Sequence, residues 1–388
     1  MPNRPLASLV LLALLLAACG QPAAPTATPQ PAAPTAAPPA SPTPAPAVAP
    51  AATATPPAAP TSAPPAAPTA PAASPIPAAG TATPAATPVA LTRVTVALDW
   101  YPWANHTGLY LARERGYYRA EGLDVELYVP ANPEDGLKLV AAGRDTFGIS
   151  YQTDVLLARG EGVPVKSVAA LVQQPLNTIM TLKTSNITRP RQLEGKKIGT
   201  AGLPSDDALL ATMLAYDGAD PKKVETINVG FDLVPALIGG KVDAIIGGYW
   251  VHESILAELQ GYPVNVMRVE EYGVPPYYEL VLIASDQTVA RQADLIRRFL
   301  RATARGYADA GADHKAALDL LVKVNPETNR AMEERGLPLL APLWTRGAAY
   351  FGQQTAARWQ AYADWMKARG ILKPEVNPAE AVALDLAG

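Results

Sequence analysis

Residues 93–129 read RVTVALDWYPWANHTGLYLARERGYYRAEGLDVELYV, and this stretch decides the fold class. Its alternating apolar residues predict a strand over Arg93–Leu98, and apolar residues at helical spacing predict a helix over Asn105–Glu121. A second strand is predicted over Asp124–Val129. A strand, a helix and a strand in this order form a βαβ unit, which indicates a parallel sheet covered by helices.

The same alternation continues towards the C-terminus and then begins again. The first series runs to a predicted strand at Asn177–Leu182, a second series starts at Lys197–Thr200, and the chain after Asp286 is almost all helical in pattern. We therefore predict an α/β fold with mostly parallel sheets, divided into two lobes with a ligand cleft between them. The first lobe is expected at about residues 91–183 and 285–388, and the second at about residues 184–284.

The first 19 residues have the pattern of an export signal. Arg4 precedes an apolar run, Leu6–Ala18, that is too short for a comfortable membrane helix, and Leu16–Cys19 resembles the bacterial lipobox, whose cysteine is lipidated. This predicts a signal peptide over residues 1–19, a lipid anchor on Cys19 and a protein held at the cell membrane, facing outside the cytoplasm. Residues 20–90 are rich in proline, alanine and threonine, which predicts a disordered tether.

Composition and motifs exclude several classes of protein. A net charge of −3 gives no basic footprint for nucleic acid. The single cysteine lies in the signal, so the domain after it has no disulfide scaffold, cysteine zinc site or thiol nucleophile. His252–Leu256 begins like a HExxH zinc motif but lacks the second histidine, and no P-loop or GxSxG elbow is present. We therefore expect a protein that is not an enzyme and that holds no cofactor or metal.

Candidate binding residues follow the ends of the predicted strands, where ligands bind in open α/β sheets. Aromatic side chains from three separate turns can stack on a flat ring, and the acids and amides beside them can read its polar edges. A serine at a predicted helix start after the strand Lys197–Thr200 adds free backbone N–H groups, although capping alone also explains it. The candidates are Asp99, Trp100, Trp103, His106, Tyr151, Gln152, Ser205, Tyr249, Trp250 and Glu279.

Five segments resemble the thiamine-pyrimidine-precursor family of periplasmic-type binding proteins, which serves vitamin ABC importers and shares its fold with eukaryotic pyrimidine synthases. They read LDWYPWANHTGLYLARERGYY from Leu98, NPEDGLKLVAAG from Asn132, YQTDVLLAR from Tyr151, VGFDLVPAL from Val229 and YGVPPYYELV from Tyr272. The resemblance implies a two-lobe type II periplasmic binding protein fold that closes like a hinged clamp. The ring-binding positions that it implies are Trp100, His106, Tyr151, Tyr249 and Glu279.

The resemblance leaves the ligand open between two vitamins. Trp103 and Trp250 stand where many pyrimidine binders look smaller and more polar, and two additional indoles would enlarge the stacking surface. We therefore favour riboflavin, with a thiamine pyrimidine precursor (formylaminopyrimidine or hydroxymethylpyrimidine) as the alternative. The implied partners are the permease and ATPase subunits of an ABC importer. A lesser alternative is an exported enzyme of the synthase branch, but this sequence lacks the cysteine-rich motif of that branch. Another is a sulfonate- or nitrate-type anion binder, which would require arginines in turns that here carry acids and aromatics.

Overall fold

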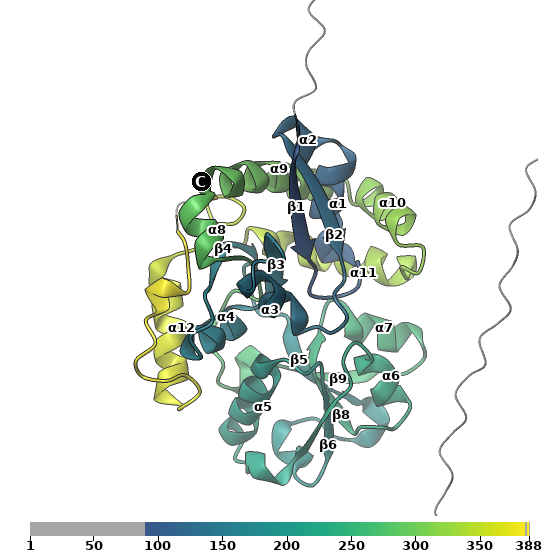
Figure 1. Ribbon diagram of the computed structural model, residues 1–388. Helices are drawn as coiled ribbons and strands as arrows, with labels where there is room; N and C mark the ends of the chain where they lie inside the picture. The colour runs from purple at the N-terminus through teal and green to yellow at the C-terminus, as the bar shows by residue number, and fades with distance from the viewer. Residues whose placement is uncertain (1–89, 385, 388) are drawn as a thin grey trace, which may run out of the picture. The chain divides into compact units, whose positions relative to one another are not determined.

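The computed structural model describes residues 90–384 and 386–387. The predicted signal peptide, its Cys19 and residues 20–89 of the predicted tether lie outside the described residues. The described chain forms two five-stranded sheets, each with its own helices, which confirms the predicted α/β class. Figure 1 shows the first sheet with β1 and β3 in the upper half of the view and the second with β6 and β8 in the lower half. No helix within the described ranges is long and apolar enough to cross a bilayer.

The first sheet has the strand order β2-β1-β3-β10-β4. Strand β1 pairs in parallel with β2 and β3, whereas β10 pairs antiparallel with β3 and β4. Four of its five strands therefore run in the same direction, as predicted, and β10, which comes from late in the chain, lies between β3 and β4 in the opposite direction. Its strands are β1 (Thr92–Ala97), β2 (Leu123–Tyr128), β3 (Phe147–Ser150), β4 (Val165–Val172) and β10 (Leu280–Ser285).

The second sheet repeats this arrangement with the order β7-β6-β8-β5-β9. Strand β6 pairs in parallel with β7 and β8, and β5 pairs antiparallel with β8 and β9. The two lobes thus share one topology, as the restart of the sequence pattern suggests. The strands are β5 (Asn177–Leu182), β6 (Lys197–Thr200), β7 (Glu225–Asn228), β8 (Ala244–Tyr249) and β9 (Val264–Arg268).

The chain passes between the lobes earlier than the predicted boundaries at residues 183 and 284. Strand β5 belongs to the second sheet and β10 to the first, so the two crossing segments are residues 173–176 and 273–279. The apolar pattern of a strand is the same in either sheet, and only the pairing partner assigns it.

Most helices belong to the first lobe, and α1 crosses α9 at very short range. A Cβ on Gly306 would come within 2.0 Å of the Gly108 carbonyl oxygen, so this crossing requires glycine. The predicted helix over Asn105–Glu121 is interrupted by Gly116, whose φ of 74° ends α1. The first-lobe helices are α1 (Thr107–Glu114), α2 (Tyr117–Ala120), α3 (Asp135–Ala141), α4 (Gln152–Gly160), α8 (Asp286–Arg291), α9 (Ala293–Ala312), α10 (His314–Val324), α11 (Arg330–Leu340) and α12 (Ala356–Ala368).

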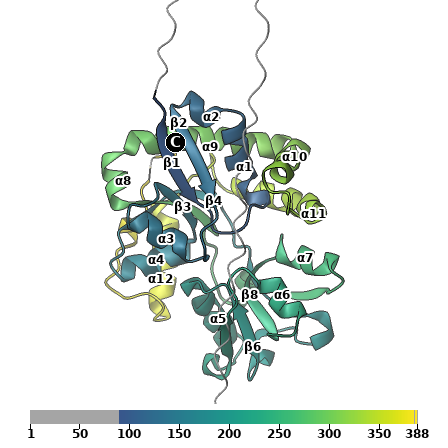
Figure 2. The same cartoon turned by 45° about the vertical axis from the view of Figure 1, so that its right-hand side comes forward.

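The second lobe carries three helices that pack on its sheet, and α11 and α7 lie side by side where the lobes meet (Figure 2). These helices are α5 (Pro204–Tyr216), α6 (Leu233–Ile238) and α7 (Glu253–Leu259). Short 3₁₀ turns occupy Ala104–His106, Lys183–Ser185, Pro190–Leu193, Pro221–Lys223, Val269–Tyr272, Ala341–Trp344 and Pro378–Glu380.

Candidate functional site in the cleft between the lobes

A pocket lies between the two lobes, at the turns that follow the strands. The first lobe contributes the turn after β1 and the residue before α4, and the second contributes the turns after β6 and β8. Both sheets therefore supply the walls, as expected for a cleft at the strand ends. The side chains of the wall include Asp99, Trp100, Trp103 and Tyr151 from the first lobe, and Asn177, Ser205, Asp206, Tyr249, His252 and Glu253 from the second.

Aromatic rings from opposite lobes face one another at this pocket. The Trp103 ring lies 5.9 Å from the Tyr249 ring and 4.8 Å from the His252 ring, both across the cleft. The Trp100 ring meets Phe231 of the second lobe edge to face at 4.8 Å. Such a wall offers π-faces to a planar ligand, and the contacts form only when the lobes are together.

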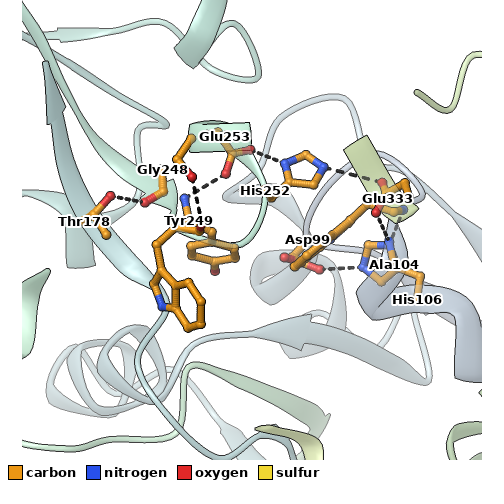
Figure 3. A network of polar contacts seen from close by, with 12 residues as sticks. Asp99, Ala104, His106, Thr178, Gly248, Tyr249, His252, Glu253 and Glu333 are labelled. Atoms are coloured by element: carbon orange, nitrogen blue, oxygen red, sulfur yellow. Dashed lines mark hydrogen bonds and ion pairs between the residues drawn. The ribbon is translucent and has the colours of Figure 1, made fainter. Parts of the chain in front are cut away.

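The carboxylate of Asp99 is held in place from both of its oxygens. The backbone N–H of Trp103 points at Nδ1 of His106 at 3.4 Å, so Nδ1 is assigned as the acceptor and Nε2 carries the proton. That Nε2–H donates to Oδ1 of Asp99 at 2.9 Å, as Figure 3 shows, while the Tyr151 hydroxyl donates to Oδ2 at 3.3 Å. His106 is fully buried behind Asp99 and does not line the pocket, so it positions the acid.

A second polar chain links the lobes through His252. Oε2 of Glu253 accepts the Tyr249 N–H at 2.7 Å, and Oε1 of Glu253 lies 2.6 Å from Nδ1 of His252. Nε2 of His252 in turn lies 3.7 Å from Oε1 of Glu333, on α11 of the first lobe (Figure 3). Burial alone would lower the pKa of His252, but the two carboxylates outweigh it and raise that pKa to about 10. A charged His252 therefore bridges an acid from each lobe.

The first turn of α5 makes a third link across the cleft. Asp154 of α4 accepts the backbone N–H of Ser205 at 2.8 Å through Oδ1 and the Ser205 hydroxyl at 2.9 Å through Oδ2. Burial raises the pKa of Asp154 to about 6, against the lowering effect of these two bonds. The predicted residue Ser205 thus has a partner in the opposite lobe.

Asp206, the next residue, has one carboxylate oxygen without a partner. Its Oδ2 accepts the Ala201 N–H at 2.8 Å, whereas its Oδ1 is buried and makes no hydrogen bond. Burial, and then the nearby carboxyl of Asp154, raise the pKa of Asp206 well above its usual range. The buried Nε1 of Trp103 is likewise without a partner. The pocket wall thus carries one carboxyl oxygen and one indole N–H without a hydrogen-bond partner.

Besides His106, three predicted site residues lie away from the pocket wall. Gln152 accepts the Tyr278 N–H at 2.7 Å, and Trp250 stacks under the Arg268 guanidinium at 4.1 Å. Glu279 accepts the N–H groups of Leu176 and Asn177 at 2.6 and 3.1 Å, which ties one crossing segment to the other. Burial raises the pKa of Glu279 to about 7. These three side chains pack against other parts of the protein instead of facing the ligand, and sequence alone does not reveal such contacts.

The prediction from sequence omitted four polar lining residues: Asn177, Asp206, His252 and Glu253. Asp206 adjoins the predicted Ser205, and Glu253 follows the predicted Tyr249 and Trp250 in the same turn, so the turns were identified but not the side chains that face the cleft. The lining residues within the described chain include no lysine or arginine, so the wall is acidic and aromatic. Among residues 90–384 and 386–387, no group of three or more His, Cys, Asp or Glu could hold a metal ion.

Comparisons with known proteins place these features in a wider group. The family model described as NMT1/THI5 like matches residues 103–317. The formylaminopyrimidine-binding protein of Halalkalibacterium halodurans is 36% identical over 296 residues, which cover 75% of this chain and 90% of that protein. The 4-amino-5-hydroxymethyl-2-methylpyrimidine phosphate synthase of Schizosaccharomyces pombe is 28% identical over 305 residues, covering 75% and 85%.

A solved structure extends the likeness at the level of the fold. The alkanesulfonate-binding protein of Xanthomonas axonopodis pv. citri superposes with a TM-score of 0.62 at 18% identity, covering 76% of this chain and 98% of that one. At this identity the likeness shows the fold alone. It confirms the predicted periplasmic binding protein fold.

Two predictions from sequence need correction in the light of the relatives. The prediction that the chain is not an enzyme is wrong as it stands, because relatives that match over most of its folded length are named as pyrimidine synthases. The preference for riboflavin is also not supported, because these relatives are named for single-ring pyrimidines. Its structural premise fails in part as well, since Trp103 lines the pocket but Trp250 does not.

Proposed function

Because the chain belongs to the NMT1/THI5-like family, we propose that it is a solute-binding protein that captures a thiamine pyrimidine precursor. Formylaminopyrimidine is the preferred ligand, since the relative at 36% identity is named for it. In this proposal the loaded protein delivers the ligand to the permease and ATPase subunits of an ABC importer.

The observation that carries the proposal is the chemistry of the pocket wall. Trp100, Trp103 and Tyr249 offer flat aromatic faces, and each ring that stacks on a heterocycle contributes about 1–3 kcal/mol. Among the carboxyl groups of the wall, Asp206 keeps one oxygen without a partner, which suits a ring bearing an N–H group. A wall without lysine or arginine among its described residues disfavours a phosphate or sulfonate ligand.

The aromatic lining favours one ring over three. Riboflavin would need a long stacking surface, and the second indole expected for it, Trp250, is engaged with Arg268 away from the pocket. The contacts between Trp103 and the two rings of the opposite lobe also limit the width of the slot. A single pyrimidine needs fewer aromatic faces than riboflavin does.

Binding is coupled to closure in this mechanism. The ligand touches both lobes, so it favours the closed form by its differential affinity for that state. The pairs His252–Glu333 and Asp154–Ser205 then hold the lobes together around it. The permease recognises this closed form and releases the ligand by separating the lobes.

The sequence pattern at the N-terminus supports a location for this activity at a membrane. Residues 1–19 with Cys19 fit a lipoprotein signal, so we propose an anchor at the outer face of the cytoplasmic membrane. The 70 or so residues between Cys19 and β1 would let the domain reach its permease, because a proline-rich chain extends by ~3.1 Å per residue.

The test is a calorimetric titration of the purified domain with four compounds: formylaminopyrimidine, hydroxymethylpyrimidine, the phosphate ester of hydroxymethylpyrimidine, and riboflavin. We expect formylaminopyrimidine to bind most tightly and the phosphate ester to bind much more weakly than its alcohol. Trp100→Ala should weaken the binding of formylaminopyrimidine by about 5- to 150-fold, equivalent to the loss of one stacking contact. The matched control is Tyr262→Ala, because Tyr262 is 45% exposed and does not line the pocket. Tighter binding of riboflavin or of the phosphate ester would refute the proposal.

A further inference from the structure

Resting on the proposed function, we propose that Asp206 determines specificity by accepting a hydrogen bond from the exocyclic amino group of the bound pyrimidine. The carboxylate lines the pocket, is fully buried, and leaves Oδ1 without a hydrogen-bond partner. A ligand N–H directed at this oxygen favours the ionised carboxylate, which accepts on both oxygens, so it contributes more than one directed at a satisfied oxygen.

The other carboxylates of the wall already have partners on both oxygens. Asp99 accepts from His106 on Oδ1 and from Tyr151 on Oδ2. Glu253 meets the Tyr249 N–H through Oε2 and His252 through Oε1. Among the lining carboxyl groups of the described chain, Asp206 is therefore the one with an oxygen that makes no hydrogen bond.

The backbone around Asp206 fixes the direction of that oxygen. The Ala201 N–H holds Oδ2 at 2.8 Å from one side. On the other side is Gly247, another pocket residue, where an added Cβ would stand 3.0 Å from Oδ1. The φ of 95° at Gly247 also favours glycine, so the space in front of Oδ1 is kept open by the backbone itself.

The neighbouring residue links this contact to closure. Ser205 is held by Asp154 of the opposite lobe, so the first turn of α5 reaches its place in the wall when the lobes are together. An amino group bound to Asp206 is then enclosed by the first lobe. Recognition of the amino group and clamping of the lobes thus depend on adjacent residues of one helix.

Asp206→Asn separates this role from a structural one. An asparagine has one oxygen and one NH₂ group, whereas both oxygens of Asp206 would face donors: the Ala201 N–H and the ligand amino group. In the free protein the asparagine oxygen can accept from Ala201, so the fold is retained. With ligand bound, its NH₂ group must face the ligand's NH₂ group, and one hydrogen bond is lost.

The experiment is a two-by-two comparison of affinities by calorimetry. The proteins are the purified chain as wild type and as the Asp206→Asn variant. The probes are 4-amino-5-hydroxymethyl-2-methylpyrimidine and the same ring with hydrogen in place of the amino group. We expect removal of the amino group to weaken binding to wild type by about 10- to 100-fold, and to weaken binding to Asp206→Asn by about twofold at most. Asp207→Asn is the matched control, because Asp207 is exposed on the same turn, and it should behave as wild type.

Equal losses in both proteins would overturn the role of Asp206 and leave the proposed function standing. Failure of wild type to bind either probe or formylaminopyrimidine would instead refute the proposed function. A crystal structure of wild type with the amino probe provides a second measurement that does not depend on the variant folding. The inference requires the amino nitrogen within about 3.2 Å of Oδ1 of Asp206, and a longer distance contradicts it.

Discussion

Replacing Asp154 tests whether the link to Ser205 stabilises the closed cleft. Asp154 does not line the pocket, so its replacement acts on closure without removing a ligand contact. Asp154→Asn keeps both bonds, because its oxygen accepts the Ser205 N–H and the Ser205 hydroxyl can rotate to accept from its NH₂ group. Asp154→Ala loses both bonds. The pair of variants therefore differs by two hydrogen bonds across the cleft.

The expected difference follows from the worth of those two bonds. Each neutral hydrogen bond contributes about 0.5–1.5 kcal/mol net, so the two together contribute about 1–3 kcal/mol to the closed form. If the free protein is mainly open, the whole difference is transferred to ligand affinity, which corresponds to about 5- to 150-fold. Asp154→Ala should bind formylaminopyrimidine more weakly than Asp154→Asn by that factor.

In the wild type, ligand affinity should also depend on pH, because Asp154 can titrate. Burial raises the pKa of Asp154 to about 6 from an ordinary value of 3.8, so protonation favours the closed form. This contribution is fully present below about pH 4 and is lost as the pH rises through about 6. Wild-type affinity should therefore fall over that range relative to Asp154→Asn, whose side chain does not titrate.

The assay is calorimetric titration with formylaminopyrimidine at pH 5 and pH 8, with small-angle scattering to follow closure. Glu161→Gln, an exposed carboxylate at the end of the same helix, is the control and should match wild type. Equal affinities for Asp154→Ala and Asp154→Asn would refute the reasoning, because the two hydrogen bonds would then contribute nothing to closure.

Three further predictions follow from the structure. Trp250→Ala should leave pyrimidine affinity within about twofold of wild type, since Trp250 stacks on Arg268 outside the pocket; a loss beyond tenfold in the same titration would contradict this. Glu279→Gln should flatten the dependence of the unfolding free energy on pH, measured by urea titration. Burial raises the pKa of Glu279 from 4.5 to about 7, so its contribution is present below about pH 4.5 and roughly 3 kcal/mol of it is lost as the pH rises through 7; an unchanged slope would argue against it. Cys19→Ser should abolish labelling by radioactive palmitate in the full chain and release the protein from membranes, and retained label would rule out Cys19 as the anchor.

The positions of the helices and strands could largely be read from local pattern. The predicted strand Asn177–Leu182 agrees residue for residue with β5, and Lys197–Thr200 with β6, because alternating or continuous apolar residues depend on nearest neighbours. The assignment of β5 and β10 to a sheet could not be read in this way. Pairing joins residues far apart in the chain, and the same apolar run satisfies either sheet.

The turns that build the site were predictable, whereas the role of each side chain in them was not. Trp100, Trp103, Tyr151 and Tyr249 line the pocket, as an aromatic cluster at strand ends suggests. Glu279 was expected to read the ligand, but its carboxylate holds the crossing segments together. An acid in a turn can face a ligand or a backbone N–H group with equal chemical ease, so its role depends on which donors the fold brings near.

The sequence by itself determined the α/β class, the two-lobe repeat, the strand ends that carry the site and the family to which the chain belongs. These follow from local periodicity, from glycine positions and from motifs that stay contiguous along the chain. Only the tertiary structure decided that Asp206 keeps a free oxygen while Asp99 and Glu253 do not. The physical reason is that a hydrogen bond depends on distance and direction between groups from separate segments, and folding alone sets these.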